Sequence, residues 1–461
     1  MRIERFEIPG LAQYSYIVSS QGEAALIDPI RDTDRYTRYL AQQGLTLTHI
    51  LETHIHADFA AGSKALAEET GAELALSAYD GGEHYQYAMP HRSLRSGDSV
   101  MVGTLRLEAL HTPGHTPEHL SFVLYDTERS ATEPMALFSG DFLFVGSLGR
   151  PDLLGEEAKL GLAHELYRSL HERIESLPDG VQLYPGHGAG SLCGAGLSDR
   201  AESTLGFERR TNSLFLLDEE SFVKEILGSV PPMPKYYPRM KVLNARGAEI
   251  LAVLPGATPI PPAQLEELRN EADVMVLDLR GPEAFGAGHI PGSVNIGAGP
   301  SLSLWSGWLL DAKSRIVMVN DQGNDEESRR ALVRVGLDHI AGYLAGGILA
   351  WIDAGLNLSR IPQLSIAEVQ DRDADAIVVD VRSDSEWTSG HIAKARHMML
   401  GDLRQELSEV PRETLIITVC GSGYRSYIAA SLLVREGYRN VSSMDGGMGA
   451  WNREGFPVAG L

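Results

Sequence analysis

The sequence predicts a multidomain protein that combines the α/β and α+β fold classes. Its length of 461 residues suggests about three domains, since one domain commonly takes roughly one to two hundred residues. Hydrophobic residues make up 43% and charged residues 22% of the chain, as in ordinary globular proteins. Short apolar runs with strand character alternate with helical segments. We therefore expect several compact domains built from sheets and helices.

Charge and cysteine content restrict the function classes. The chain has 40 Lys and Arg residues against 62 Asp and Glu residues, a net charge of −22. This acidity argues against nucleic acid or an anionic membrane as the main partner, because both attract clustered cations. Two cysteines cannot form a disulfide framework, and the N-terminus carries charges where a signal peptide needs an apolar core. The uncharged stretch 284–310 is broken by Gly, Pro and Ser, so we expect a soluble cytoplasmic protein.

The first half of the chain predicts a mixed α/β region. Apolar, strand-like runs occupy residues 24–27 and 105–110, and helical segments occupy residues 63–70 and 159–177. Residues 228–241 then carry four prolines and no apolar periodicity. This composition indicates a linker or a strap at a domain edge.

Two later segments resemble each other and predict a duplicated domain. Asp278-Leu-Arg280 recurs about 100 residues later as Asp380-Val-Arg382. A Gly-His-Ile triplet, and a Gly-Gly pair followed by Trp, recur in the same order. Each copy alternates apolar strands with helical stretches, a pattern typical of βα units around a largely parallel sheet. We expect the strands at residues 274–279, 316–319, 377–381 and 415–419.

Four polar turns in the first part of the chain place potential metal ligands just after apolar runs. The first turn reads His-Ile-His-Ala-Asp, and each of the others offers a histidine or an aspartate beside Gly or Pro. The ends of neighbouring strands converge in a sheet-based fold, so these side chains should meet. A lone histidine is usually structural, but this recurrence favours a metal site. The candidates are His54, His56, Asp58, His115, Asp141 and His187.

Over about residues 1–230 the chain resembles the metallo-β-lactamase superfamily, in the order of its motifs THIHAD, HTPGHT, SGD and PGH. The resemblance implies an αββα sandwich. Hydrolases of that superfamily, such as glyoxalase II, usually carry a further histidine after the first motif, where it helps to hold a second metal. Here that position is Phe59, and a phenyl ring cannot coordinate a metal. A complete dinuclear zinc site is therefore not expected.

One metal held by two histidines and a carboxylate is instead the ligand set of non-haem Fe(II) oxygenases. Persulfide dioxygenases of the superfamily use such a triad, and residues 142–152 also resemble that group. The resemblance implies one Fe(II) per chain, with zinc an option in recombinant material, held by His54, His115 and Asp141. It leaves three residues as the surrounding shell or as alternative ligands: His56, Asp58 and His187.

Cys420 begins a loop with the composition of a nucleophile site. It follows the apolar run 415–419 and precedes a helix expected to begin near Ser426. Amides of a Gly-rich loop at a helix N-terminus favour negative charge, and Arg425 adds to the field, so the thiolate should be favoured. A buried structural cysteine is the alternative. The loop and its flanks resemble the rhodanese sulfurtransferases, which implies Cys420 and Arg425 as catalytic residues and a persulfide cradle of Gly421, Ser422, Gly423, Tyr424 and Ser426.

The middle repeat lacks this nucleophile. Residues 320–325 read Asn-Asp-Gln-Gly-Asn-Asp where the cysteine loop should lie, and no cysteine occurs between positions 194 and 419. Acidic side chains there would also repel an anionic substrate. We expect an inactive rhodanese-like domain with a scaffold or interface role.

Cys193, the other cysteine, lies six residues after His187. Because it lies close to the candidate ligand His187 in the sequence, one interpretation is that Cys193 relays sulfur. The other interpretation is a small apolar side chain that fills space.

These features together imply a persulfide dioxygenase domain with linker (1–240), an inactive rhodanese-like domain (241–357) and an active rhodanese domain (358–461). O2 would oxidise a low-molecular-weight thiol persulfide to thiol and sulfite, and Cys420 would transfer sulfane sulfur to sulfite, giving thiosulfate in sulfide detoxification. The expected partners are thiol persulfides, O2, sulfite and thiosulfate, with no nucleic acid or membrane, in a homo-oligomer. The alternatives are a zinc glyoxalase II-like thioester hydrolase fused to a sulfurtransferase, and a non-enzymatic sulfur carrier.

Overall fold

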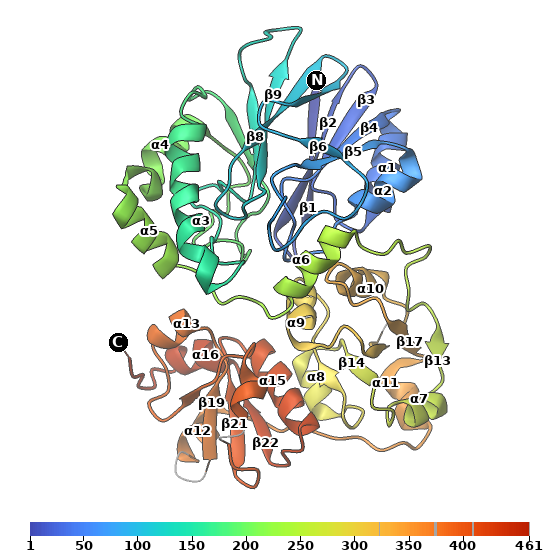
Figure 1. Ribbon diagram of the computed structural model, residues 1–461. Coiled ribbons are helices and arrows are strands. Elements are labelled where there is room, and N and C mark those ends of the chain that lie inside the picture. Colours follow the sequence, from blue (N-terminus) through green and yellow to red (C-terminus); the bar gives the residue numbers. More distant parts are fainter. Residues whose placement is uncertain (322, 373–375, 408–409, 461) are drawn as a thin grey trace. The chain divides into compact units, whose positions relative to one another are not determined.

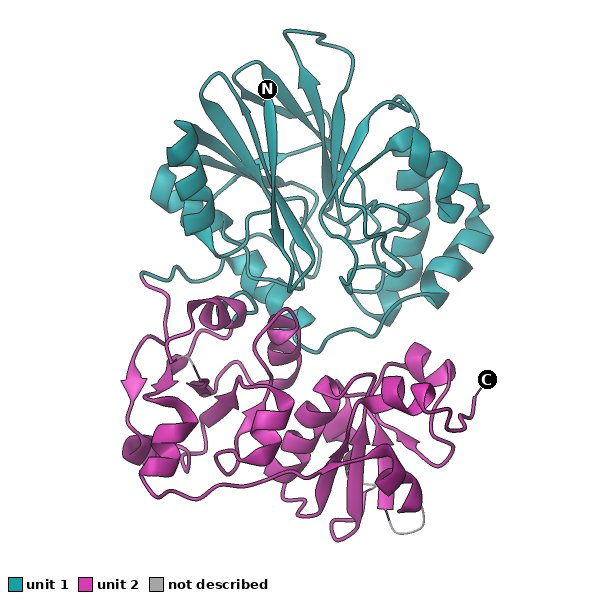
Figure 2. Ribbon diagram, turned by 180° about the vertical axis from the view of Figure 1, so that it is seen from behind, with its two compact units in different colours: residues 1–252, 333–336 teal, residues 253–332, 337–461 magenta. Residues whose placement is uncertain are grey.

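The computed structural model describes residues 1–321, 323–372, 376–407 and 410–460. Contacts divide the chain into two compact units, which Figure 2 shows in different colours. The first unit comprises residues 1–252 and 333–336, and the second comprises residues 253–332 and 337–461. Within the described ranges, every helix is too short or too polar to cross a bilayer.

Two six-stranded sheets form the centre of the first unit (Figure 1). One has the order β1-β2-β3-β4-β5-β6, with helices α1 (Thr33–Gln43) and α2 (Ser63–Thr70) on its outer face. The other has the order β12-β11-β10-β9-β8-β7, with α3 (Glu156–Arg168), α4 (Leu205–Thr211) and α5 (Glu219–Gly228) outside it. The predicted αββα sandwich is confirmed. Its strands are β1 (Arg2–Ile8), β2 (Gln13–Ser20), β3 (Glu23–Ile27), β4 (Thr46–Leu51), β5 (Glu73–Ser77), β6 (Arg92–Leu94), β7 (Ser99–Val102), β8 (Leu105–His111), β9 (Leu120–Asp126), β10 (Ala136–Gly140), β11 (Gln182–Pro185) and β12 (Ser203–Thr204).

The core of the first unit lies between the two sheets. Along β8, Leu105, Leu107 and Ala109 are buried while the residues between them are partly exposed. This period of two is the pattern of a strand with one face in the core. A second core joins the outer face of the second sheet to α3 and α5, so both faces of that sheet are covered. The core between the sheets includes Tyr16, Val18, Leu51, Leu107, Phe122 and Phe138.

The second unit contains two five-stranded sheets with equivalent strand orders, and all their pairings are parallel. The first order is β13-β17-β16-β14-β15 and the second is β18-β22-β21-β19-β20. Trp351 and Trp451 are buried at equivalent places, which confirms the duplication. The strands are β13 (Pro259–Ile260), β14 (Val274–Asp278), β15 (Val294–Asn295), β16 (Arg315–Val319), β17 (Ile340–Leu344), β18 (Gln363–Leu364), β19 (Ala376–Asp380), β20 (Arg396–His397), β21 (Leu415–Val419) and β22 (Val441–Met444).

Short helices connect these strands, as expected for βα units. In the first repeat they are α7 (Pro262–Leu268), α8 (Pro282–Ala287), α9 (Leu302–Leu309), α10 (Glu326–Val333) and α11 (Gly347–Asp353). In the second repeat they are α12 (Ile366–Asp371), α13 (Asp384–Thr388), α14 (Leu403–Glu406), α15 (Tyr424–Arg435) and α16 (Gly447–Arg453).

The structure differs from the sequence expectation in three segments. The helix expected over 159–177 is α3 followed by a π-helical turn, Ser169–Arg173. Helix α15 begins at Tyr424, two residues before the expected start, because Gly423 takes the left-handed conformation that ends the loop. The segment 228–241, expected to be a linker or a strap at a domain edge, contains the start of helix α6 (Tyr237–Arg246). Its proline lies in the first helical turn, where no backbone N–H is needed.

Candidate metal centre and cysteine loop

The candidate metal ligands follow strands of both sheets of the first unit. His54 comes after β4, His115 after β8, and Asp141 directly after β10. One ligand atom of each lies within 4.8 Å of the others, and all three residues are buried. Asp141 Oδ2 is 3.5 Å from His115 Nε2 and 3.8 Å from His54 Nε2. The strand ends therefore bring together two imidazoles and one carboxylate.

Hydrogen bonds aim the free nitrogens of both histidines into this cluster. The Thr53 hydroxyl donates to Asp28 Oδ2 at 2.8 Å, so His54 Nδ1–H donates to the Thr53 hydroxyl at 2.9 Å. His115 Nδ1–H donates to the Arg150 carbonyl at 2.9 Å. The Nε2 lone pairs therefore face Asp141. Burial also holds the pKa of His54 and of His115 well below the ordinary value, which favours the neutral form that binds metals.

Within the described part of the chain, two buried atoms of the cluster lack hydrogen-bond partners, as expected of atoms that bind a metal ion. Among the described residues, His115 Nε2 and Asp141 Oδ2 have no hydrogen-bond partner although both are buried. Such orphaned atoms are rare in native proteins and are costly when nothing binds them. A cation between these atoms satisfies both.

His187 orients the carboxylate of the cluster. Its Nδ1 lies 2.7 Å from Asp141 Oδ1, and its Nε2 lies 2.8 Å from Asp58 Oδ2. Burial alone would lower the pKa of His187, but the two carboxylates raise it well above its ordinary value. An imidazolium between Asp58 and Asp141 holds one oxygen of Asp141 and leaves the other free for the cluster.

His56 lies beside His54 but is engaged differently. The two ring centroids are 4.2 Å apart, and His56 Nε2 lies 3.1 Å from Asp28 Oδ1. Among the atoms that the structure describes, His56 Nδ1 has no partner. The Phe59 ring packs on the His56 ring with centroids 4.3 Å apart. This face of the centre therefore presents an aromatic ring where a second metal would need a ligand.

The Cys420 loop lies between β21 and α15. The Gly423 N–H donates to Cys420 Sγ at 3.1 Å, and the Ser426 hydroxyl lies 3.7 Å from the same sulfur. The Met448 N–H bonds the Cys420 carbonyl at 2.7 Å. A Cβ on Gly447 would lie 2.3 Å from that carbonyl oxygen, so only glycine permits this approach. The Gly-Gly turn before Trp451 thus packs against the backbone of the Cys420 loop and supports it.

Arg425 pairs with a glutamate that we did not predict. Both terminal nitrogens of Arg425 lie 2.6 Å from the carboxylate oxygens of Glu386. Partial burial opposes ionisation, but Arg425 and the Ser383 donors lower the pKa of Glu386 to about 2. The middle repeat, residues 261–354, has Ala284 at the corresponding place, six residues after the Asp of the Asp-x-Arg motif. The repeat that lacks the loop cysteine therefore also lacks the glutamate.

In the middle repeat, Asn320 stands where Cys420 stands in the other repeat, directly after the equivalent strand. Asn320 is buried, and its amide has no partner within the described part of the chain. Gln322 of the same loop lies outside the described residues. The recurring Asp-x-Arg motif makes the same contacts in both repeats: Arg280 bonds Asp278 and the Gly288 carbonyl, and Arg382 bonds Asp380 and the Gly390 carbonyl.

Known protein families match both the part of the chain that contains the metal-ligand cluster and the part that contains the two repeats. Residues 8–187 match the Metallo-beta-lactamase superfamily. The mitochondrial persulfide dioxygenase ETHE1 of Bos taurus is 33% identical over 220 residues, which are 47% of this chain and 76% of that protein. The chain belongs to the metallo-β-lactamase superfamily. Residues 261–354 and 365–454 each match the rhodanese-like domain family, so two rhodanese-like domains follow the metallo-β-lactamase domain.

Two other relatives extend the comparison. A hydroxyacylglutathione hydrolase of Polaromonas sp. is 36% identical over 177 residues, which are 38% of this chain and 61% of that protein. The crystal structure of a metallo-beta-lactamase from Staphylococcus aureus subsp. aureus COL is 36% identical with a TM-score of 0.67. It covers 75% of this chain and 99% of its own. The likeness to that structure therefore extends beyond the metallo-β-lactamase domain.

Helix α6 holds the loop of residues 52–62, which carries His54 and is called the metal loop below. Asn244 Nδ2 donates to the carbonyls of His56 at 2.8 Å and Phe59 at 2.7 Å, and its Oδ1 accepts from the Ala61 N–H at 2.9 Å. Lys241 Nζ, fully buried, donates to the Ile55 carbonyl at 2.8 Å. Of the two interpretations of the segment 228–241, a linker or a strap at a domain edge, the contact of Lys241 favours the strap for its last residues.

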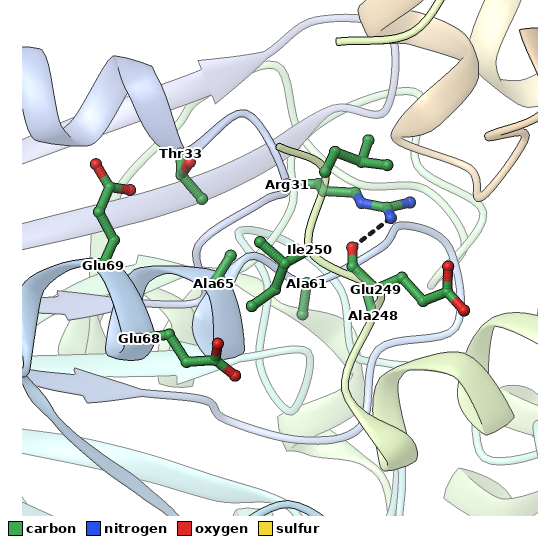
Figure 3. Close-up of a pocket in the computed structure, with 10 residues that line it drawn as sticks. Arg31, Thr33, Ala61, Ala65, Glu68, Glu69, Ala248, Glu249 and Ile250 are labelled. Carbon is green, nitrogen blue, oxygen red and sulfur yellow. Dashed lines mark hydrogen bonds between the residues drawn. The ribbon is translucent and has the colours of Figure 1, made fainter. Parts of the chain in front are cut away.

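A pocket of about 370 Å³ lies beside this clamp, between α2 and the segment that follows α6 (Figure 3). The Arg31 guanidinium donates to the Glu249 carbonyl at 2.6 Å across it. Its lining does not include the ligand cluster, and consists of Arg31, Thr33, Ala61, Ala65, Glu68, Glu69, Ala248, Glu249, Ile250 and Leu251. The pocket shows that the chain after α6 continues along the metallo-β-lactamase domain.

Cys193 lies beside the metal cluster. It is buried, and its sulfur is within 4.8 Å of ligand atoms of Asp58 and His187. The Arg150 N–H bonds the Cys193 carbonyl at 2.8 Å, so one residue links this loop to His115. Burial, with the nearby carboxylates of Asp58 and Asp141, raises the pKa of the Cys193 thiol well above its ordinary value. The side chain is therefore a neutral thiol in this environment.

Proposed function

We propose that this protein oxidises a low-molecular-weight thiol persulfide with O2 to thiol and sulfite, and couples this reaction to thiosulfate formation. The observation that carries the proposal is the buried cluster of two imidazoles and one carboxylate with Phe59 beside it. That cluster suits a single redox-active metal with open positions better than a dinuclear hydrolytic site. The relationship to persulfide dioxygenase ETHE1 supports the same reaction class.

The metal in the proposal is one Fe(II), held by His54, His115 and Asp141. Bound there, iron would supply the redox chemistry by which O2 oxidises a sulfane sulfur. The chain's own residues set the site: Arg150 fixes the His115 ring, and His187 fixes the Asp141 carboxylate. His56 and Asp58 belong to the surrounding shell in this assignment. Asp58 groups with His187 and Cys193 rather than with the three ligands, and His56 Nε2 bonds Asp28.

The second reaction centre in the proposal is Cys420, with the loop 421–426 as its persulfide cradle. Cys420 carries an outer sulfane sulfur, and sulfite attacks that sulfur. The new sulfur–sulfur bond makes thiosulfate, and the electron pair of the broken bond returns to Cys420 as thiolate. The Gly423 N–H that contacts Sγ stabilises this returning charge. The middle repeat has no part in this transfer, because Asn320 occupies its nucleophile position.

The net stoichiometry needs no other co-reactant. One persulfide, one O2 and one water give one thiol, one sulfite and two protons. A second persulfide supplies the sulfane sulfur on Cys420 and leaves as thiol. Two persulfides are thus converted to two thiols and one thiosulfate, which is the chemistry of sulfide detoxification. We place this reaction in a reducing cytoplasm, since both cysteines are free. The homo-oligomer expected above is kept as part of the proposal.

A zinc thioester hydrolase joined to a sulfurtransferase is the second candidate. The 36% identity to hydroxyacylglutathione hydrolase over 177 residues favours it. Phe59 opposes it, because the position that completes a second metal site cannot coordinate.

The test is anaerobic reconstitution of the full chain with Fe(II), followed by O2 uptake on persulfides of glutathione, coenzyme A and bacillithiol. We expect about one iron per chain, O2 uptake and thiosulfate. In Cys420→Ser the product should shift toward sulfite while O2 uptake continues, because the hydroxyl is a far weaker nucleophile. Initial rates are compared, since sulfite also reacts slowly with persulfide alone. Thioester hydrolysis without O2 uptake, or thiosulfate from Cys420→Ser at the parent's initial rate, contradicts the proposal.

A further inference from the structure

Helix α15 begins at the end of the Cys420 loop and presents one face to the inactive repeat of the same unit (Figure 1). Three residues that make contacts from this face, Tyr424, Ser431 and Arg435, are seven and four positions apart, which places them along one side of a helix. Tyr424 Oη donates to the Gly297 carbonyl at 3.0 Å, and Ser431 Oγ accepts from the Asn295 N–H at 3.0 Å. One turn later, Arg435 donates to the Gly292 carbonyl at 2.6 Å. The inactive repeat therefore holds the whole length of this helix.

Tyr424 joins this face to the sulfur. It is the first residue of α15, and it directly follows Gly423, whose N–H contacts Cys420 Sγ. Gly423 has a φ of 109°, a conformation in which backbone freedom is large. The direction of its N–H therefore depends on what fixes the residue after it. The bond from Tyr424 to Gly297 is such a fixed point.

The inactive repeat is built to present this carbonyl. Asn295 Nδ2 donates to the carbonyls of Asp278 at 3.0 Å and Arg280 at 2.9 Å. The Arg280 guanidinium is in turn bound to Asp278. Gly297 follows two residues after Asn295, and a Cβ there would lie 3.3 Å from both the Tyr424 ring and the Arg280 carbonyl. The Asp-Leu-Arg motif of this repeat thus fixes the end of β15, and the Gly297 carbonyl that binds Tyr424 follows that end.

We propose that the inactive repeat positions the persulfide loop, with Tyr424 and Gly297 as the pair that transmits its support to Cys420. Tyr424 is a positioning residue: its hydroxyl bonds the Gly297 carbonyl, and it acts on the sulfur through Gly423. The measurement of sulfur transfer rests on the proposed function of Cys420. The measurement of alkylation does not, because it follows the reactivity of the Cys420 thiol itself.

The experiment uses the full chain with Cys193→Ser, so that Cys420 is the remaining thiol. Tyr424→Phe removes the hydroxyl and keeps the ring, and Gly297→Ala disturbs the contact from the inactive repeat. Tyr427→Phe is the matched control, since within the described residues its hydroxyl makes no hydrogen bond. Gly281→Ala is the control in the inactive repeat, because its φ is −59° and the nearest atom to a Cβ is 3.6 Å away.

We measure the rate constant for alkylation of Cys420 by iodoacetamide, and kcat and KM for transfer from thiosulfate to cyanide. Tyr424→Phe and Gly297→Ala should each lower the alkylation rate constant and kcat by about three- to tenfold, the effect of one hydrogen bond, with little change in KM. Partial unfolding would instead split the alkylation into two phases, so a uniform slow phase identifies a positioning role.

Alkylation of Tyr424→Phe or Gly297→Ala at the parent rate overturns the inference. An equal loss in the two control variants also overturns it, because the effect would then be general destabilisation. If the parent transfers no sulfur while the alkylation rates follow the expected order, the proposed function fails and the positioning role stands.

Discussion

Replacing Asn244 by alanine tests whether α6 holds the metal loop. The side-chain amide satisfies three buried backbone groups: the carbonyls of His56 and Phe59, and the N–H of Ala61. Each group left unsatisfied costs about 1 to 3 kcal/mol, so at the lower end the loss in unfolding free energy is about 3 kcal/mol. For a unit of this size, 1 kcal/mol lowers Tm by about 2 to 4 °C, which gives a shift of about 6 to 12 °C.

The same change should weaken the metal site, because the three groups belong to the loop that carries His54. Loss of such outer support commonly costs about 10- to 100-fold in metal affinity. Melting curves of the apo and Fe(II)-loaded full chain, with chelator competition, measure both effects. Val242→Ala is the control, since this side chain is 39% exposed on the same helix. If Asn244→Ala melts within about 2 °C of the parent and retains the metal equally, α6 does not support the loop.

Three further predictions concern the two reaction centres. His115→Ala should abolish metal retention and O2 uptake while sulfur transfer by Cys420 continues; metal analysis and the two assays check this, and loss of both activities contradicts separate sites. Cys193→Ser should slow persulfide turnover at unchanged iron content if this thiol relays sulfur, whereas unchanged kinetics on every persulfide identify a space-filling residue. Glu386→Gln should lower the unfolding free energy at neutral pH, because it removes the ion pair with Arg425. The loss should be only about 1 kcal/mol, because the pair is partly exposed. The pKa of Glu386 falls from 4.5 to about 2 on folding, so this difference in unfolding free energy should be complete above pH 4.5 and vanish toward pH 2. A difference that is independent of pH in chemical denaturation would count against the pair.

The sequence predicted the parts of both sites that depend on short spacing. Asp141 directly follows a strand, and His54 and His115 follow theirs within a few residues, so strand geometry places all three near strand ends. Cys420 follows its strand in the same way. The two repeats were recognisable because their motifs recur in order, and the equivalent strand orders confirm them.

The supporting residues could not be predicted from spacing. Asn244 acts on carbonyls more than 180 positions earlier in the chain, and nothing near position 244 indicates that distance. Glu386 lies 39 positions before Arg425, and its helix resembles any short capped helix. Asp28 is the exception, since it follows the strand β3 directly and its position at a strand end was a usable signal. Contacts between distant segments need the tertiary fold, which local patterns do not contain.

The clamp by α6 has a consequence for where this chain can be divided. A breakpoint in the proline-rich stretch before Tyr236 appears natural from composition, and the superfamily match itself ends at residue 187. Cutting there would remove Lys241 and Asn244 and leave their carbonyl partners at the metal loop without donors. A recombination event or an expression fragment that keeps a working metal loop must therefore extend through Arg246. The boundary that composition suggests between the metallo-β-lactamase and rhodanese-like parts therefore lies inside the first compact unit, and the boundary at which the parts can be separated lies further toward the C-terminus.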